Sequence, residues 1–108
     1  MKSAKYCFLW LTCKDAREAA TIANALLVKH LVACVKQWPV QADFHWQAKI
    51  EHSNEIMLCM ESRLDLFDQI EAEVRKLHSY ETFVLEATPI EKISKNAATW
   101  LKKELKNA

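Results

Sequence analysis

Residues 6–11 are apolar on both faces of the strand that they are expected to form. Alternate side chains of a strand point to opposite faces of its sheet. One face carries Tyr6, Phe8 and Trp10, and the other carries Cys7, Leu9 and Leu11. Residues 56–60 repeat this pattern, with Ile56, Leu58 and Met60 on one face and Met57 and Cys59 on the other. Both strands are therefore expected to be buried on both faces, which restricts the folds open to the chain.

Four strands are expected in all. They cover residues 4–12, 32–50, 55–61 and 80–88. Pro39 interrupts the second strand, which indicates an edge strand, a bulge or a break there, because proline cannot donate a hydrogen bond to a neighbouring strand. Residues 52–54, which are His, Ser and Asn, are predicted to form the turn between the second and third strands.

Three helices are expected between and after these strands. Asp15 and Glu18 match a capping box, and the helix that they begin runs to about residue 30. Residues 62–65 resemble an acidic capping motif for a second helix with a buried stripe of Leu64, Phe67, Ile70, Val74 and Leu77. Ser94 is expected to cap a last helix. The order βαββαβ with an extra C-terminal helix predicts an α+β, ferredoxin-like fold in a single domain of residues 1–108.

The helices of such a fold cover only one face of its sheet. The second set of apolar side chains would then face water, and soluble monomers rarely expose a large apolar patch. Packing against other copies of the chain is the expected solution. Closed symmetry makes a ring or a dimer the candidates.

The sequence contains no glycine. Glycine-rich phosphate loops, dinucleotide turns and EF-hand loops depend on it, so these nucleotide and calcium sites are excluded. Fifteen basic and fourteen acidic residues are interspersed along the chain, with no basic stripe for nucleic acid. The longest uncharged apolar stretch, residues 6–13, is too short to cross a membrane. We expect neither a nucleic-acid partner nor a membrane partner.

The four cysteines indicate a reducing compartment. Cys7, Cys13, Cys34 and Cys59 form no C-x-x-C pair, which excludes a zinc knuckle. The first residues do not resemble a secretion signal. A cytoplasmic protein with reduced thiols is expected.

Several segments resemble, in order, the CutA divalent-cation tolerance family. They are Leu11-Thr-Cys-Lys-Asp15 before the first helix, Leu31-Val-Ala-Cys-Val35, Trp46-Gln-Ala-Lys-Ile50 with Glu55, and His78-Ser-Tyr-Glu81 with Pro89. The resemblance extends over about residues 6–105. It implies a ferredoxin-like subunit in a tight homotrimer, similar in shape to PII signalling trimers and located in the cytoplasm. It also implies a role in tolerance of copper and other divalent metals, with no established enzymatic reaction.

The resemblance implies a cleft between subunits that contains Trp46, Glu55, Tyr80 and Glu81. Two interpretations stay open for this cleft. Trp46 can pack at the interface while Glu55 accepts hydrogen bonds, or the residues can line a pocket for a small ligand. The chain departs from the family pattern near the cleft, at Ala48, Glu61, Ser79 and Ile93.

The resemblance also implies a site for Cu(II) or another divalent metal, with His78 and Cys13 as the candidate ligands. Thr12 and Leu77 occupy the positions of the family's cysteine and of its first histidine. Only His78 therefore matches directly, and Cys13 lies one residue beyond the aligned position. The alternative for His78 is a structural role at the C-terminus of a helix.

Three classes of function remain. The leading one is a non-enzymatic trimeric scaffold, sensor or metal-binding protein. A small hydrolase is the second, with Cys13 and His78 as a thiolate–imidazole pair, and a PII-like trimer that signals through a small ligand is a further alternative. A binder of single-stranded RNA with exposed sheet aromatics is opposed by the neutral charge and the absence of glycine.

Overall fold

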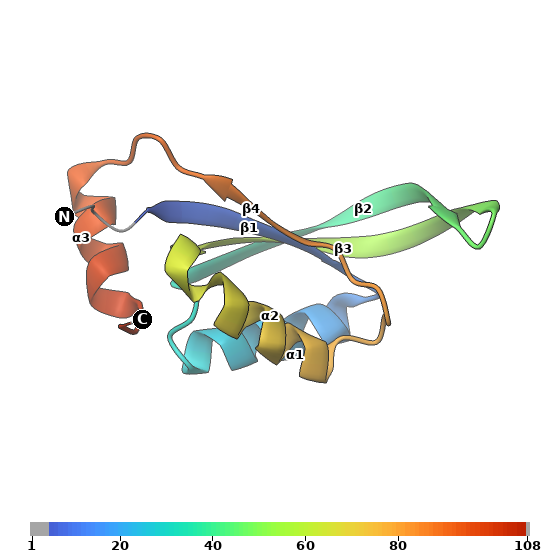
Figure 1. The fold of residues 1–108 in the computed structure, drawn as a ribbon, viewed down its shortest axis with the longest axis horizontal. Coiled ribbons are helices and arrows are strands. Elements are labelled where there is room, and N and C mark those ends of the chain that lie inside the picture. Colours follow the sequence, from blue (N-terminus) through green and yellow to red (C-terminus); the bar gives the residue numbers. More distant parts are fainter. Residues whose placement is uncertain (1–4, 108) are drawn as a thin grey trace.

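A four-stranded antiparallel sheet forms the centre of the computed structural model, which describes residues 5–107 (Figure 1). The strands are β1 (Tyr6–Cys13), β2 (Cys34–Trp46), β3 (Lys49–Arg63) and β4 (Leu85–Pro89), in the spatial order β2-β3-β1-β4. The helices are α1 (Ala16–Val28), α2 (Phe67–Leu77) and α3 (Lys95–Glu104), with a short 3-10 turn, Leu64–Leu66, before α2. The predicted ferredoxin-like α+β fold with an extra C-terminal helix is confirmed.

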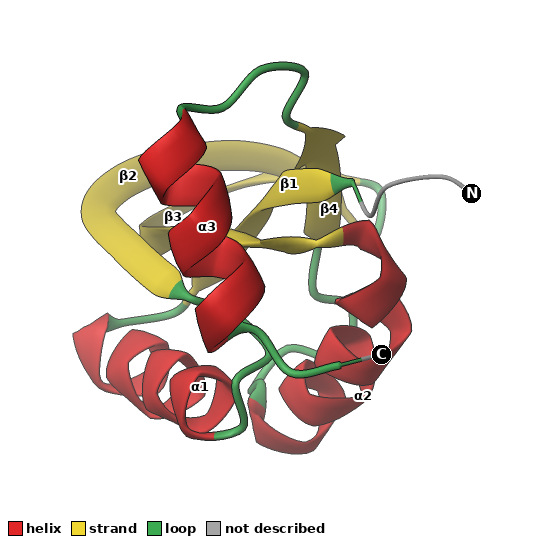
Figure 2. Cartoon of the chain, turned by 90° about the vertical axis from the view of Figure 1, so that its left-hand side faces the viewer, coloured by secondary structure: helices red, strands yellow, loops and turns green. Residues whose placement is uncertain are grey.

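Helices α1 and α2 lie side by side under one face of the sheet (Figures 1 and 2). β1 alternates as the sequence predicts, and the side chains that face the helices are buried: Cys7, Leu9, Leu11 and Cys13. They pack in one core with the apolar stripes of the two helices: Ile22, Leu26, Ile70 and Val74. The periodicities of strand and helix thus position the core as expected.

The two helices under the sheet begin in different ways. Asp15 Oδ1 accepts a hydrogen bond of 2.9 Å from the Glu18 N–H, which confirms the predicted cap of α1. The prediction for α2 is wrong, because this helix has no side-chain cap. The hydroxyl of Ser62 instead donates to the Leu31 carbonyl oxygen over 2.6 Å. Leu77 is exposed, so the buried stripe of α2 ends before it.

The hairpin turn lies at Gln47 and Ala48, so the prediction of a turn at residues 52–54 is wrong. Trp46 pairs with Lys49, which leaves a two-residue loop with φ angles of 49° and 65°. A loop of this kind needs positive φ at both positions, and glycine or asparagine normally signals it. The chain uses neither there, so the turn carries no sequence signal. Of the three alternatives at Pro39, the edge strand is confirmed, since β2 lies at the edge of the sheet and continues through this proline.

The β2–β3 hairpin extends well beyond the rest of the sheet (Figure 1). β1 ends opposite Ile56, so residues 40–55 of the hairpin have no third strand beside them. We call these residues the hairpin arm. The arm gives the molecule its length, with extents of 47 × 26 × 23 Å.

Residues 80–84 form a loop, so the prediction that β4 begins at Tyr80 is wrong. β4 begins at Leu85, which pairs with Leu11 near the end of β1. β1 continues for two residues beyond Leu11, but residues 83 and 84 do not pair with them. The Thr12 carbonyl oxygen of β1 lies instead 2.8 Å from His78 Nε2. The loop runs instead from the end of α2 toward the hairpin arm.

Helix α3 lies at the end of the sheet opposite the arm (Figures 1 and 2). Ser94 occupies its N-cap position, as predicted, but its side chain makes no capping hydrogen bond. The Lys106 N–H donates to the His30 carbonyl oxygen over 2.9 Å, which ties the segment after α3 to the end of α1. No helix of residues 5–107 is both long and apolar enough to span a membrane.

Candidate functional site

The four residues predicted to share a cleft lie together in the structure. Trp46 and Glu55 belong to the hairpin arm, and Tyr80 and Glu81 belong to the loop after α2. The loop and the arm lie beside each other because β1 ends before reaching this part of the sheet. Tyr80 connects the loop to the arm, since it lines a hollow with Trp46 and its hydroxyl bonds to Glu55.

Tyr80 and Glu55 form the polar centre of this region. The Tyr80 hydroxyl donates to Glu55 Oε2 over 3.2 Å. Glu55 is only 5% exposed, and Tyr80 is half-buried. Burial and the nearby Glu55 carboxylate raise the pKa of Tyr80, so the phenol stays protonated and remains a hydrogen-bond donor.

Two hollows meet at the aromatic side chains of the arm and the loop. Both are lined by Phe44, Trp46, Tyr80 and Thr82. One hollow, of about 420 Å³, adds Glu51, Ser79 and Glu81 to its walls. The other, of about 330 Å³, adds Thr12, Ala42, His45, Glu55 and Val84. We call the two hollows together the aromatic groove.

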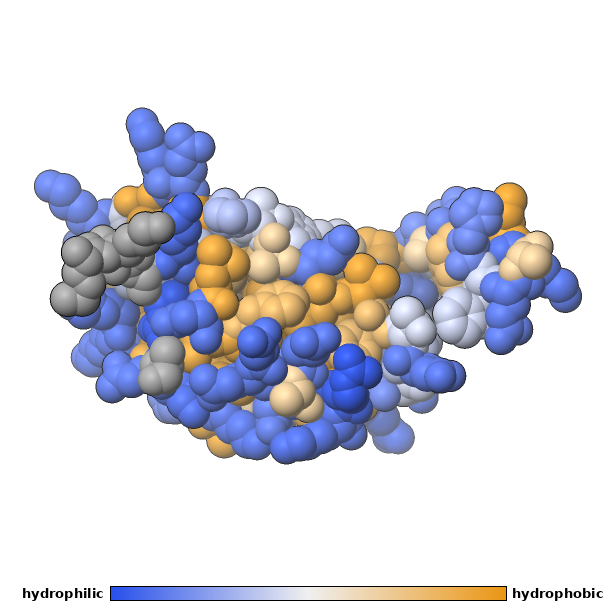
Figure 3. Space-filling model, in the orientation of Figure 1, coloured by the Kyte–Doolittle hydropathy of each residue, from blue (hydrophilic) through white to orange (hydrophobic). Residues whose placement is uncertain are grey.

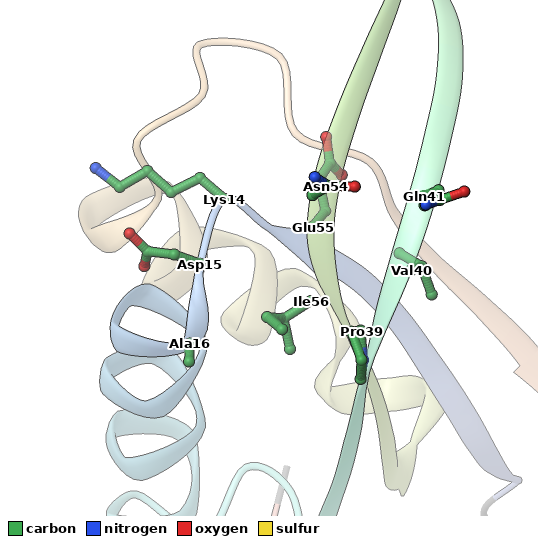
Figure 4. A pocket seen from close by; sticks show the side chains of 9 residues that line it. All are labelled: Lys14, Asp15, Ala16, Pro39, Val40, Gln41, Asn54, Glu55 and Ile56. Atoms are coloured by element: carbon green, nitrogen blue, oxygen red, sulfur yellow. The ribbon is translucent and has the colours of Figure 1, made fainter.

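A third hollow, of about 590 Å³, lies between the start of α1 and the base of the arm (Figure 4). Its walls include Lys14, Asp15, Pro39 and Glu55. The Lys14 side chain extends away from Glu55 in this view. The third hollow therefore brings no positive charge to the Glu55 carboxylate.

The two predicted metal ligands, Cys13 and His78, also lie close together, and the structure adds Glu18. One potential ligand atom from each of the three residues lies within 4.8 Å of the others. Glu18 comes from the first turn of α1, Cys13 from the end of β1, and His78 from the residue after α2. A thiol, an imidazole and a carboxylate are ligand types that suit copper or zinc.

Hydrogen bonds occupy both ring nitrogens of His78. Nε2 lies 2.8 Å from the Thr12 carbonyl oxygen, which can only accept, so Nε2 carries the hydrogen. Nδ1 accepts the Tyr80 N–H over 3.0 Å. The ring is therefore neutral, and no nitrogen lone pair is left for a metal. His78 fits the structural alternative, but through these bonds and not through a positive charge.

The Glu18 carboxylate is also in use. Oε1 accepts the Lys14 N–H over 2.9 Å, and Oε2 accepts the Ser79 N–H over 2.7 Å. Burial opposes the charge of Glu18, but the hydrogen bonds from Lys14 and Ser79 hold the pKa of its carboxyl below the ordinary value. Glu18 thus joins the start of α1 to the loop after α2.

The Cys13 thiol keeps its proton. Burial, together with the carboxylates of Glu18 and Glu55, raises the pKa of Cys13 to about 12. Metals bind the thiolate, and nucleophilic catalysis also requires it. The thiol is protonated, both imidazole nitrogens are hydrogen-bonded and the carboxylate is bonded to two backbone groups, so a divalent metal would have to displace the thiol proton and several of these bonds in order to bind here. In this arrangement Cys13 and His78 are a thiol and a hydrogen-bonded imidazole, not the thiolate–imidazole pair of a hydrolase.

Comparison with known proteins establishes the family of the chain. A family model described as CutA1 divalent ion tolerance protein matches residues 7–104. The chain belongs to the CutA1 family.

Individual relatives agree with this assignment. The divalent-cation tolerance protein CutA of Archaeoglobus fulgidus is 36% identical over 94 residues, which cover 87% of this chain and 92% of that protein. A solved structure described as the periplasmic divalent cation tolerance protein CutA from Archaeoglobus fulgidus has a TM-score of 0.91 at 34% identity, covering 94% of this chain and 99% of that one. The crystal structure of CutA1, a stable protein from the psychrotrophic bacterium Shewanella sp. SIB1, has a TM-score of 0.91 at 28% identity, covering 98% of this chain and 100% of that one.

In this CutA1 chain, sequence reasoning found most of the residues that the structure brings together. Trp46, Glu55, Tyr80 and Glu81 lie around one groove, and their role in a ligand site stays a prediction. Glu18 was missed as a neighbour of His78. The capping-box spacing placed its side chain at the first turn of α1, but no local signal indicated its bond to Ser79, 61 residues away.

Proposed function

We propose that this CutA1-family protein acts in the tolerance of divalent cations as a non-enzymatic homotrimer. Family membership supports the role in tolerance. The relative from Archaeoglobus fulgidus is described as a divalent-cation tolerance protein, and the match covers 92% of its length. The apolar sheet face described below supports self-association. The proposal assigns no resident metal to Cys13, Glu18 and His78, because their polar groups are already bonded or protonated.

We infer the homotrimer from the apolar sheet face that is turned away from α1 and α2. We call it the open face, and its apolar residues are Phe8, Trp10, Trp38, Met57 and Cys59. Trp38 is 42% exposed and packs edge-on against Trp10, with 6.5 Å between ring centroids. Figure 3 views the sheet from its edge, so the open face lies along the upper side of the molecule, away from the hydrophilic helical side. Burying this surface against other copies removes the large cost of leaving it in water.

A non-enzymatic role is supported by the state of the side chains that could do chemistry. Cys13 is a buried, protonated thiol, and His78 is a neutral ring with both nitrogens bonded. A nucleophile needs an adjacent base or a lowered pKa, and the pair has neither. The protein is therefore proposed to act through binding and assembly, as a PII-like trimer does when it responds to a ligand.

We propose a cytoplasmic location for the protein. Cys7, Cys13, Cys34 and Cys59 are all free thiols in the structure, and free thiols persist in a reducing compartment. Fractionation of source cells, followed by detection of the protein with an antibody, tests the proposal. Recovery with periplasmic markers would overturn it.

Native mass spectrometry of the reduced protein tests the assembly. The proposal predicts a species near 37.5 kDa, which corresponds to three chains of 12.5 kDa. Trp10→Asp, which places a charge on the open face, is expected to give a monomer, and Trp100→Asp, on the exposed side of α3, is the matched control. Cys59 on the open face should resist iodoacetamide in the assembled protein and react in the Trp10→Asp variant. A wild-type monomer would contradict the homotrimer.

Growth of a deletion strain tests the role in tolerance. The strain should lose viability at Cu(II) concentrations that the wild type tolerates, and the wild-type gene should restore growth. Trp10→Asp should fail to restore it if the trimer is the active form. Unchanged growth of the deletion strain on copper, cobalt and zinc would contradict the proposed role.

A further inference from the structure

We infer that the aromatic groove binds a small organic ammonium ion. This goes beyond the proposed role in metal tolerance, and it assigns a ligand class to residues of the arm and of the loop after α2. Four properties of the groove carry the inference: its charge, the environment of Glu55, its exposed aromatic rings and its size.

The walls of the groove are negatively charged. Glu51, Glu55 and Glu81 line it, and no lysine or arginine does. His45 is the one residue of the lining with a basic side chain, and it is an exposed residue of the arm. The charge therefore favours a cation as the occupant.

Glu55 provides a buried negative charge without a counter-ion. It is 5% exposed and accepts one hydrogen bond, from the Tyr80 hydroxyl, through Oε2. Within residues 5–107, Oε1 has no hydrogen-bond partner, and no basic side chain forms an ion pair with this carboxylate. Lys14 lines the neighbouring hollow but extends away from Glu55 (Figure 4). Because no side-chain oxygen of the described residues is both fully buried and without a hydrogen-bond partner, Oε1 reaches the groove, where a bound cation can pair with it.

The aromatic rings distinguish an organic cation from a metal ion. In the single chain Phe44 is 39% exposed and Trp46 is 42% exposed, and both line the groove with Tyr80. Ammonium groups bind over the faces of such rings, and aromatic cages recognise quaternary ammonium ions in this way. A hard divalent cation instead needs several oxygen ligands close together. Within the described residues, the one cluster close enough to hold a metal is Cys13, Glu18 and His78, outside the groove.

The size of the groove fits a small molecule. The two hollows measure about 420 Å³ and about 330 Å³ and meet at Trp46 and Tyr80. Small-ligand sites combine apolar walls with a few polar groups that fix orientation. Here the rings provide the apolar walls, and Glu55 with the Tyr80 hydroxyl provides the polar end.

Ligand-observed NMR with the full-length, reduced protein tests this assignment, with choline chloride as the probe. The matched control ligand is 3,3-dimethylbutan-1-ol, which has the same shape without the charge. Choline should show saturable binding, and the neutral alcohol should bind at least about tenfold more weakly, because it gains neither the ring contact nor the carboxylate. Equal binding of the two compounds would show a merely apolar groove and would overturn the inference.

Substitutions locate the binding. Glu55→Gln and Trp46→Ala should each weaken choline binding by about fivefold or more, since each removes one recognition element. Glu91→Gln and Trp100→Ala change an exposed glutamate and an equally exposed tryptophan away from the groove, and both should leave binding unchanged. If Trp46→Ala alters the mass in native spectrometry, Glu55→Gln and Tyr80→Phe carry the test. Choline binding that Glu55→Gln leaves intact would overturn the inference.

Two further outcomes separate this inference from the proposed function. Displacement of choline by an equimolar amount of MgCl₂ would show a divalent-cation site and overturn the organic ligand. Absence of choline binding to an intact trimer would show that a partner subunit covers the groove or neutralises Glu55, and would also overturn it. Neither result alters the expected copper phenotype of the deletion strain.

Discussion

His78 donates its Nε2 hydrogen to the carbonyl oxygen of Thr12 over 2.8 Å, and so joins the end of α2 to the end of β1. The second ring nitrogen accepts the Tyr80 N–H and thereby fixes the start of the loop that carries Tyr80 and Glu81. The histidine that the family resemblance associates with a metal therefore acts here as a neutral bridge between backbone groups. It positions the groove without being part of its lining.

Removal of this bridge should destabilise the fold. His78→Ala leaves the Thr12 carbonyl and the Tyr80 N–H without their partner, and we expect a loss of about 2–4 kcal/mol in the free energy of unfolding. Urea denaturation at a fixed protein concentration measures the loss. Leu77→Ala, at the exposed neighbouring position, is the control and should cost much less. Equal losses in the two variants would contradict a structural role for His78.

Glu18 should make stability depend on acid pH. Because its pKa is lowered in the folded state, the unfolded chain binds the proton more tightly, and stability is lost as pH falls through the folded pKa. Glu18→Gln should be less stable than wild type near neutral pH by about 1–3 kcal/mol. This difference should shrink as the pH falls from about 6 to about 3, as followed by urea denaturation at each pH. Glu91→Gln, an exposed control, should show no such pH-dependent difference.

The hairpin turn offers a stabilising substitution. Ala48 has a φ of 65°, a conformation that costs an alanine roughly 1 kcal/mol and costs glycine little. Ala48→Gly should therefore raise the free energy of unfolding by up to about 1 kcal/mol, despite the greater freedom of glycine in the unfolded chain. Ala20→Gly, the same exchange in the exposed side of α1, should lower it by about 1 kcal/mol. A lower free energy of unfolding for Ala48→Gly than for the wild type would contradict the assignment of strain to Ala48.

The two thiols in the core should be unreactive in the folded protein. Burial, followed by the charge of Asp65, raises the pKa of Cys7 to about 11, and the pKa of Cys13 is raised to about 12. Iodoacetamide near neutral pH should leave both unlabelled in the native protein and label both in urea, as mapped by mass spectrometry of peptides. Rapid native labelling of Cys13 would restore the hydrolase hypothesis.

Local sequence patterns predicted most of the fold, and the errors have a tertiary cause. The alternation in β1 and the stripe of Ile22 and Leu26 follow directly from the sequence. The turn at Ala48 was missed because an alanine with positive φ has no sequence signal. Residues 82–84 have strand-like composition, yet they form a loop, and the Thr12 carbonyl oxygen of β1 is bonded to the His78 ring in their place. A local sequence pattern does not show that a side chain from another element bonds to the backbone of a neighbouring strand.

The candidate site was predictable only in part. The resemblance to a family grouped Trp46, Glu55 and Tyr80, but it did not indicate that Tyr80 donates to Glu55 or that this carboxylate lacks a counter-ion. The resemblance also associated His78 with a metal and did not indicate that its ring bonds to two backbone groups. The contacts of Glu55 and of His78 depend on which groups meet across the fold, and a single sequence does not record them.

Strand β3 passes through both surfaces to which we assign a role. Its residues on one face are Glu51 and Glu55 in the groove and Met57 and Cys59 on the open face. No loop or hinge separates the two pairs, because they follow one another along a continuous 15-residue strand. Any change in the tilt of the arm on ligand binding would therefore also change the packing between subunits, because one continuous strand carries both surfaces.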